Sequence, residues 1–218
     1  MKKRGARLLI FFIILSVICF YFDEFLVQYV SFFRNNFLDN FFLVITFVSS
    51  EIILFFVLTA LFLWTEKKRG WILPLWICLG SSAFVSFILK IIVQRTRPFQ
   101  LGLVELIFNL QSSSYEIWNF SFPSFQSMLV FSAIPIIVYN FPKLKKFWIA
   151  FAVLVAFSRV YFGIHFFSDV IAGALIGYLI GIRILNLEKN KKFKFTSFPF
   201  VRHKVGRGQR IYQKIFRK

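Results

Sequence analysis

Long apolar stretches constrain this chain more than any other feature. A helix needs about 20 apolar residues to cross a bilayer, where only helices and closed barrels satisfy all backbone hydrogen bonds. The pattern therefore predicts an all-α fold, a polytopic bundle of six transmembrane helices in residues 1–186, followed by a basic tail in residues 187–218. The six predicted spans are 8–30, 41–64, 71–93, 126–142, 147–163 and 166–186.

Composition supports the membrane assignment. Of the 218 residues, 58% are apolar, against about 45–50% in a soluble domain. This composition excludes a disordered chain, a collagen-like chain and a disulfide scaffold. Cys19 and Cys78 both lie inside apolar stretches, so we expect free thiols.

The distribution of positive charge predicts the orientation. The net charge is +18, but Lys and Arg form short runs between apolar stretches, which argues against nucleic-acid binding. Of the 27 Lys and Arg residues, 22 fall on one predicted side of the membrane. By the positive-inside rule that side and both termini are cytoplasmic, and the tail is expected to bind anionic lipid. The five cations on the other side are Arg34, Lys90, Arg95, Arg97 and Arg159.

The N-terminus has a basic head followed by an apolar run, as a signal peptide does. No small-residue cleavage site follows the run, since the chain continues with Tyr21-Phe22-Asp23-Glu24. We therefore predict an uncleaved first span that continues past Asp23 and Glu24.

Three polar segments fall at the outer ends of the predicted spans. In the first, Lys90 and Arg97 are seven residues apart, which places them on one helix face, and Pro98 predicts the end of that helix. In the second, Ser124 is a good N-cap for the fourth span, whose free backbone N–H groups form an anion site.

The third segment joins the fifth and sixth spans. Arg159 precedes the turn, and His165 and Asp169 are four residues apart, the spacing of one helix face. A stripe of small residues follows, which predicts close packing of this helix on a neighbour and directs His165 and Asp169 into the bundle. The stripe consists of Gly173, Gly177 and Gly181.

Together the segments predict a site for a phosphate dianion. Such a group in a partly dry site needs several cations and N–H donors, which Lys90, Arg97, Arg159 and the Ser124 helix start supply. An imidazole held by a carboxylate suits a nucleophile or a base.

These segments resemble the three-part signature of the type 2 phosphatidic acid phosphatase superfamily. The chain reads Lys, six residues, Arg-Pro; then Pro-Ser at a helix start; then Ser-Arg, five residues, His, three residues, Asp. The resemblance implies that Lys90, Arg97, Ser124 and Arg159 hold phosphate. It also implies that His165 attacks phosphorus and carries the phosphoryl group, with Asp169 orienting it.

The resemblance further implies a substrate class and a location. Family substrates are membrane lipids with phosphate or diphosphate heads, such as phosphatidic acid, phosphatidylglycerol phosphate, undecaprenyl diphosphate or lipid A, cleaved without a metal or other cofactor. The expected partners are thus a lipid phosphate and the bilayer. The expected location is the bacterial inner membrane, with the site facing the periplasm or outside.

The middle motif departs from the family pattern. Where the family has Pro-Ser-Gly-His, this chain has Phe125 and Gln126 in the last two positions. Phe125 keeps the backbone N–H that would contact phosphate, but it adds bulk. Gln126 can donate a hydrogen bond to phosphate, yet it cannot replace the His that protonates the leaving oxygen.

Three explanations stay open for this departure. The leaving group is already a weak base, or another acid such as Glu105, Tyr115 or Glu116 takes over, or the protein binds lipid phosphate or a partner without turnover. Transfer of the phosphoryl group to a second lipid is a further alternative to hydrolysis.

Three features outside the motifs carry expectations of their own. Glu51 lies alone in the second span, either paired with Lys90 or Arg159 or as a protonated or hydrogen-bonded carboxyl. Arg95 is expected to contact lipid headgroups. The mixture of apolar, aromatic and acidic residues in 99–122 predicts an interfacial segment or a lid over the site.

Overall fold

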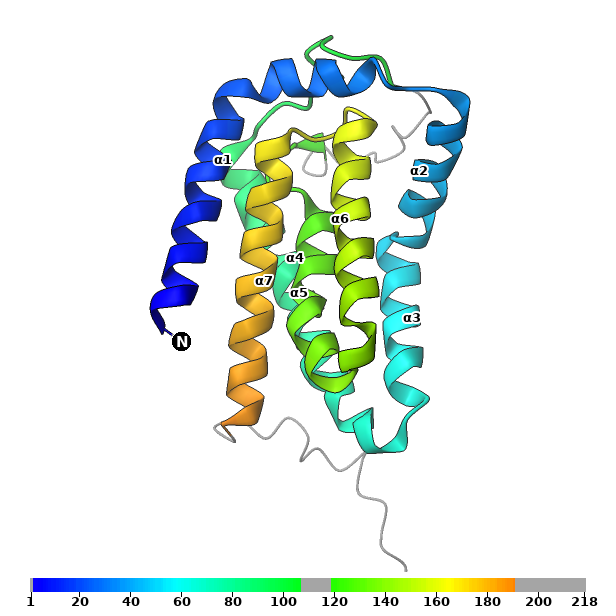
Figure 1. Cartoon of the computed structure of the whole chain (residues 1–218), viewed down its shortest axis with the longest axis vertical. Coiled ribbons are helices and arrows are strands. Elements are labelled where there is room, and N and C mark those ends of the chain that lie inside the picture. Colours follow the sequence, from blue (N-terminus) through cyan, green and yellow to red (C-terminus); the bar gives the residue numbers. More distant parts are fainter. Residues whose placement is uncertain (1, 107–118, 191–218) are drawn as a thin grey trace, which may run out of the picture.

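The computed structural model describes residues 2–106 and 119–190, and all the regular secondary structure within them is helical. The all-α prediction is therefore confirmed for this part of the chain, and Figure 1 shows the helices running side by side in one bundle. In chain order the elements are α1 (Lys2–Ser31), α2 (Asn36–Val48), α3 (Glu51–Leu63), the 3₁₀ helix η1 (Glu66–Trp71), α4 (Ile72–Val93), α5 (Phe125–Asn140), the 3₁₀ helix η3 (Pro142–Leu144), α6 (Lys145–Tyr161) and α7 (Phe167–Lys189).

All six predicted apolar stretches are helical. Three segments are long and apolar enough to cross a membrane, namely Ile13–Ser31, Glu66–Val93 and Phe167–Lys189, and α2 with α3 makes a fourth if the pair is one span. At 16 residues α5 is a shorter apolar helix. The presence of membrane-spanning helices is thus supported, whereas the count of six and the sides of the termini stay predictions.

The predicted span 41–64 is not one continuous helix. It is broken between α2 and α3, whose axes are bent by 62°. Ser49 caps the end of α2, Ser50 is the N-cap of α3, and Glu51 lies in the first turn of α3. The Ser50 hydroxyl makes no capping hydrogen bond, but an acidic residue in the first turn favours a new helix start at this point.

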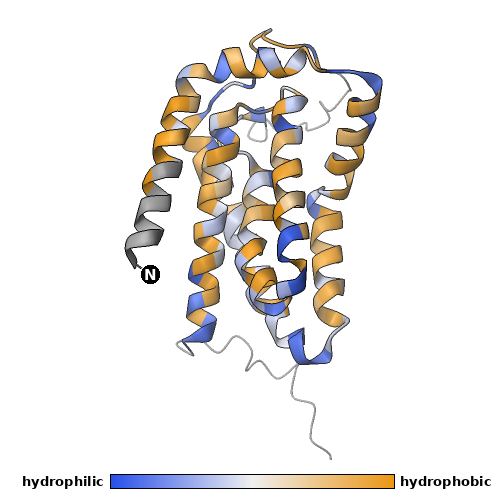
Figure 2. Ribbon diagram, in the orientation of Figure 1, coloured by the Kyte–Doolittle hydropathy of each residue, from blue (hydrophilic) through white to orange (hydrophobic). Residues whose placement is uncertain are grey.

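Apolar side chains cover the outside of the bundle as well as its core. Figure 2 shows hydrophobic residues along most of the helix lengths and hydrophilic residues gathered mainly toward the ends. Phe37, Phe47, Ile52 and Phe56 are all more than 60% exposed, as lipid-facing side chains are. The central helix is α5, where most residues are buried.

The glycine stripe of α7 packs directly on α5, as predicted. A Cβ atom at Gly173 would lie 2.6 Å from the Ser124 carbonyl oxygen, and one at Gly177 would lie 2.2 Å from that of Met128. Because no side chain fits these gaps, the two backbones approach closely. This contact directs the N-terminal end of α7 into the bundle, where His165 is 3% exposed and Asp169 is fully buried.

Basic residues from several loops meet at the end of the bundle opposite the predicted site. Lys68 Nζ donates to the Asn140 carbonyl and lies over the Phe141 ring, and Lys189 Nζ lies 4.5 Å from the centre of the Tyr139 ring. The η1 segment, the α5–α6 connection and the last turn of α7 therefore share one end (Figure 1). Of the basic tail predicted for residues 187–218, residues 191–218 lie outside the described residues.

The first helix runs alongside α7 and then crosses the other end of the bundle toward α2 (Figure 1). Its Asp23 is 1% exposed, whereas the neighbouring Glu24 is exposed. The two cysteines are free thiols and are buried, as expected.

Candidate active site

Two predicted phosphate ligands come together near the C-terminal end of α4. Lys90 Nζ donates to the carbonyl of Phe120, and Arg97 Nε donates to the carbonyl of Asn119 at 2.9 Å. The two cations thus bind consecutive carbonyls of the segment that leads into α5. Lys90 is 1% exposed, so its amino group lies inside the protein.

The helix that carries Lys90 ends earlier than Pro98 predicted. α4 ends at Val93, because Gln94 has a left-handed backbone with φ of 49° and its N–H bonds to the Lys90 carbonyl. Lys90 and Arg97 therefore do not share a helix face. They converge because the extended segment after Gln94 folds back toward residues 119–121, where Ser121 N–H donates to the Arg95 carbonyl at 2.7 Å.

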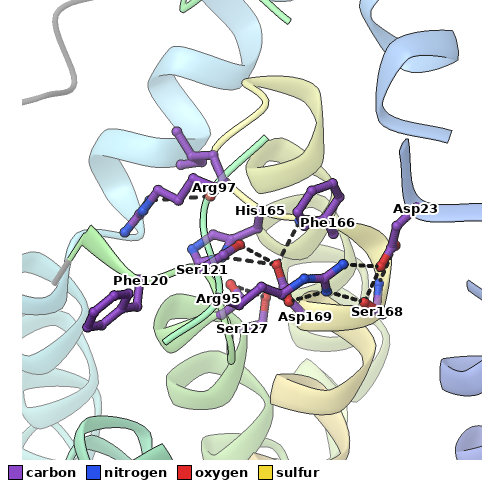
Figure 3. A network of polar contacts seen from close by, with 12 residues as sticks. Asp23, Arg95, Arg97, Phe120, Ser121, Ser127, His165, Phe166, Ser168 and Asp169 are labelled. Carbon is purple, nitrogen blue, oxygen red and sulfur yellow. Dashed lines mark hydrogen bonds and ion pairs between the residues drawn. The ribbon is translucent and has the colours of Figure 1, made fainter. Parts of the chain in front are cut away.

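His165 sits in a tight turn between α6 and α7. The Arg159 carbonyl accepts the N–H groups of both Ile164 and His165 at 3.2 Å, and Gly163 supplies the positive φ of 68° that the turn requires. Arg97 reaches the same turn, since its Nη1 donates to the Ile164 carbonyl at 3.3 Å. The chain therefore places the guanidinium of Arg97 beside the residue that precedes His165 (Figure 3).

The prediction that His165 and Asp169 share a helix face is wrong. α7 begins at Phe167, so His165 precedes the helix. The boundary falls there because the Asp169 carboxylate accepts the Phe166 N–H at 2.9 Å, the bond that an acidic residue makes in the third position of a capping box. His165 Nδ1 still lies 3.8 Å from Asp169 Oδ2.

The Asp169 carboxylate already has several donors. Oδ2 accepts from the Ser121 hydroxyl and the Phe166 N–H, and Oδ1 accepts from Arg95 Nη1 at 2.7 Å. His165 Nδ1 is buried without a hydrogen-bond partner among the described residues. At 3.8 Å the two groups interact electrostatically but are beyond hydrogen-bond distance.

Burial makes His165 a neutral imidazole. Desolvation lowers its pKa from 6.5 to about 3; Asp169 acts in the opposite direction, while the nearby positive charges of Arg97 and Lys90 lower it further. Burial also lowers the pKa of Arg97 to about 10, with Asp169 opposing the shift. At neutral pH the site thus combines an uncharged imidazole, which keeps its lone pair, with charged guanidinium groups.

The middle motif forms the start of α5. Ser124 is the N-cap, as predicted, but its hydroxyl does not cap the helix; it accepts a hydrogen bond from the Ser127 hydroxyl at 3.0 Å. The Ser124 N–H donates to the Asp169 carbonyl at 3.1 Å, which ties this helix start to α7. Phe125 and Gln126 occupy the first turn of α5 and are half-buried.

Arg159 approaches from α6 and is 2% exposed. Its Nη2 lies 3.5 Å from the Ser49 hydroxyl at the α2–α3 break, and its Nε has no hydrogen-bond partner among the described residues. Glu51 is exposed and makes no ion pair with Lys90 or Arg159 in the described part of the chain, although it lies close enough to Arg159 to interact electrostatically.

The prediction that Arg95 contacts lipid headgroups is wrong. Its Nη2 donates to Asp23 Oδ2 at 2.8 Å and its Nη1 donates to Asp169 Oδ1 at 2.7 Å, so it joins α1 to α7 (Figure 3). Sequence reasoning also missed Asp23. A carboxylate inside an apolar stretch was the available signal, because such a group is costly unless it is paired.

A cavity of about 670 Å³ lies beside this cluster, toward the α1–α2 connection. Its lining includes Arg34, Phe99 and Glu105, and none of the predicted site residues. Glu105 is one of the alternative acids; Tyr115 and Glu116, like half of the predicted lid, lie outside the described residues. Among the described residues no group of three or more His, Cys, Asp and Glu side chains could hold a metal ion.

Comparison with known proteins confirms the family to which the three motifs point. A family model described as the PAP2 superfamily matches residues 71–193, which contain every predicted site residue. This chain belongs to the PAP2 superfamily.

Named relatives of this chain are phosphatases. It is 35% identical over 127 residues to phosphatidylglycerophosphatase B of Bacillus subtilis and 28% identical over 121 residues to undecaprenyl-diphosphatase of Sulfolobus acidocaldarius. In both cases 53% of this chain is aligned, and the alignments span only 57% and 58% of the relatives' lengths.

Two solved structures have a similar fold. The PAP2-type phosphatidylglycerolphosphate phosphatase of Bacillus subtilis matches with a TM-score of 0.67 at 24% identity, over 85% of this chain and 96% of that one. LpxE of Aquifex aeolicus matches with a TM-score of 0.59 at 26% identity, over 74% and 93% of the two chains.

Proposed function

We propose that this protein is a membrane lipid phosphatase that removes phosphate from a lipid phosphate or diphosphate. The proposal rests above all on a buried, neutral His165 that lies beside the cations Lys90 and Arg97. The names of its PAP2 relatives, a phosphatidylglycerophosphatase and an undecaprenyl-diphosphatase, support this reaction class.

The proposed reaction is a double displacement at phosphorus. The lone pair of His165 Nε2 attacks, an N–P bond forms, and the P–O bond to the lipid breaks, so that the lipid oxygen leaves with the electron pair. Lys90, Arg97 and Arg159 balance the charge on the phosphoryl oxygens, and the Ser124 hydroxyl donates to one of them. Water then attacks the phosphohistidine, the N–P bond breaks, and phosphate leaves.

Asp169 orients the nucleophile in this scheme. When the imidazole turns so that Nδ1–H donates to Asp169 Oδ2, now 3.8 Å away, the lone pair of Nε2 is directed away from the carboxylate. The carboxylate also stabilises the positive charge that the ring acquires once the N–P bond has formed.

Gln126 favours a diphosphate among the possible substrates. A glutamine in the first turn of α5 can donate a hydrogen bond to the leaving oxygen but cannot give it a proton. A lipid alkoxide needs that proton, whereas a lipid phosphate released from a diphosphate is a much weaker base. We therefore propose undecaprenyl diphosphate or a similar lipid diphosphate as the preferred substrate, ahead of phosphatidylglycerol phosphate or phosphatidic acid.

We propose that the site opens on the outer face of a bacterial inner membrane. The basic end of the bundle, with Lys68 and Lys189, is then cytoplasmic, and the cluster around His165 lies at the opposite end. In this proposed orientation Arg97 and the 99–106 segment lie on the side of the outer leaflet, from which substrate would reach the site.

The deciding experiment offers the purified protein a panel of radiolabelled lipid phosphates in detergent. We expect free phosphate from wild type, most from the diphosphate, and a loss of at least about 10³-fold with His165→Ala. A labelled second lipid would instead indicate phosphotransfer. Lipid binding without either product would contradict the phosphatase proposal. It would favour a protein that binds lipid phosphate without turnover, an alternative raised by Gln126 at the position of the usual proton donor.

A further inference from the structure

We propose that Arg95 is a positioning residue for Asp169 and that Asp23 of the first helix anchors it. This inference rests on the phosphatase function proposed above, in which Asp169 orients His165. It adds two residues to the machinery of the site: Arg95, at an unspecified position within the first motif, and Asp23, which lies outside all three motifs.

The guanidinium of Arg95 bridges two buried carboxylates. Its Nη1 lies 2.7 Å from Asp169 Oδ1 and its Nη2 lies 2.8 Å from Asp23 Oδ2 (Figure 3). Asp169 is fully buried and Asp23 is 1% exposed. A planar guanidinium with two parallel donors suits this bridge, whereas the single ammonium of a lysine would not span it.

Two aromatic rings hold the guanidinium of Arg95 in place. Its Cζ lies 4.0 Å from the centre of the Phe166 ring and 5.0 Å from that of Phe20. Since both rings and both carboxylates restrain the same group, its position is well determined. Such a fixed cation can hold a carboxylate in one rotamer.

Arg95 decides which oxygen of Asp169 is available to His165. Because Arg95 takes Oδ1, Oδ2 is left facing His165 Nδ1, with the Ser121 hydroxyl and the Phe166 N–H as its other partners. Loss of the cation would leave two buried negative charges without their shared partner. The carboxylate would then turn or take up another donor, and His165 would lose its orientation.

Asp23 fixes this arrangement from a second direction. Its Oδ1 accepts the Ser168 N–H at 3.0 Å, and its Oδ2 accepts the Ser168 hydroxyl as well as Arg95. Arg95 Nη1 also donates to the Ser168 hydroxyl at 2.7 Å. Asp23 therefore ties both Arg95 and the first turn of α7 to α1, a helix that lies outside the matched family region 71–193.

The test compares the kinetics of Arg95→Ala and Asp23→Asn with those of wild type on the preferred lipid. We expect kcat to fall about 10²-fold for Arg95→Ala and about tenfold for Asp23→Asn, because small misplacement of a catalytic group is costly. KM should change less than about threefold, since neither residue contacts phosphate in the proposed complex. Glu24→Gln is the matched control, because Glu24 is the exposed neighbour of Asp23 and should retain wild-type kcat.

Chemical rescue separates positioning from general stability. Millimolar guanidinium should occupy the space left by Arg95→Ala between Phe20 and Phe166 and restore kcat at least tenfold, an expected effect of regaining a bridging cation. Methylammonium has the same charge but cannot bridge, so it should not rescue the variant. Arg95→Lys should likewise retain only partial activity.

The outcomes separate this inference from the proposed function. If wild type releases no phosphate, the phosphatase proposal fails, and the positioning role fails with it. If wild type is active but Asp23→Asn keeps wild-type kcat, or guanidinium and methylammonium rescue Arg95→Ala equally, only the positioning role is overturned. Should Arg95→Ala fail to fold, Asp23→Asn against Glu24→Gln decides the question alone.

Discussion

His165 is surrounded by protein rather than by water, and this determines its charge. It is 3% exposed, with its pKa lowered by burial to about 3, so it stays uncharged over the whole physiological range. A histidine that is neutral when folded but titrates near pH 6.5 when unfolded links stability to pH. Below that pH the unfolded chain binds a proton that the folded protein does not.

The unfolding temperature should therefore fall more steeply in acid for wild type than for His165→Gln. We expect wild type to lose up to about 1.4 kcal/mol of stability per pH unit below about pH 6.5, relative to the variant, whose side chain does not titrate. Thermal unfolding in detergent at several pH values measures this difference, and contributions from other groups cancel. Parallel pH profiles would show that His165 is not held neutral.

Gln126 offers a second test with a single side chain. Replacement by His supplies a proton donor in the first turn of α5, and general acid catalysis is worth about 10²–10⁴ in rate. We expect Gln126→His to raise phosphate release from a lipid monophosphate at least tenfold, while release from a diphosphate changes little. An unchanged or lower rate on the monophosphate would mean that the missing acid does not limit the reaction.

Candidate site residues could be predicted from the sequence where they are close along the chain or where their spacing matches a motif. Lys90, Arg97, Arg159 and His165 could be grouped in this way, and the structure brings them to one end of the bundle. Asp23 and Arg95 could not, because they are 72 residues apart and nothing in the sequence says which carboxylate a given cation will find. Partner choice of this kind depends on tertiary packing.

Whole helices were predicted with more success than their ends. The six apolar stretches are helical and the predicted span 71–93 ends where α4 does, but the expected continuation of that helix to Pro98 is wrong, and the break between α2 and α3 was missed. The left-handed backbone of Gln94 ends the helix. The sequence does not predict this, because glycine, the usual signal for a left-handed position, is absent there. At residues 49–51 the Ser-Ser-Glu signal was present, yet the long apolar run around it favoured a single span.

The contact between α5 and α7 gives a prediction at the level of elements. A Cβ at Gly177 would lie 2.2 Å from the Met128 carbonyl, so Gly177→Ala must push the two helices apart. We expect a destabilisation of about 1–3 kcal/mol, seen as a lower unfolding temperature, and a loss of activity.

Gly80→Ala is the matched control, because it makes the same substitution in a helix outside the α5–α7 contact. A Cβ at Gly80 on α4 would meet nothing within 4 Å, so this variant should be as stable as wild type or slightly more so, because alanine favours helix. Equal unfolding temperatures for the two variants would contradict close packing of α7 on α5.

At the scale of the whole molecule the charge distribution predicts a fixed orientation in the membrane. Basic segments meet at one end, and the candidate site lies at the other. Single cysteines at Lys143 and Leu101, both exposed, would report the two ends, since the native Cys19 and Cys78 are buried. We expect an impermeant thiol reagent added to whole cells to label Leu101→Cys and not Lys143→Cys.

Inverted membrane vesicles complete the orientation experiment. In them Lys143→Cys should become the labelled variant and Leu101→Cys should be protected. Labelling of both variants from the same side would mean that the two ends do not lie across the membrane from each other, and the proposed outward-facing site would have to be abandoned.

The glycine stripe of α7 limits how the site can open for a lipid. Ser124 and Asp169 lie on two helices whose backbones touch, and the Ser124 N–H is bonded to the Asp169 carbonyl. Sliding one helix along the other would force carbonyl oxygens into Cα atoms, so this half of the pocket behaves as a rigid wall. Room for an incoming headgroup must therefore come from the opposite half, where Lys90 and Arg97 donate to the carbonyls of residues 120 and 119, which phosphate oxygens can replace as acceptors.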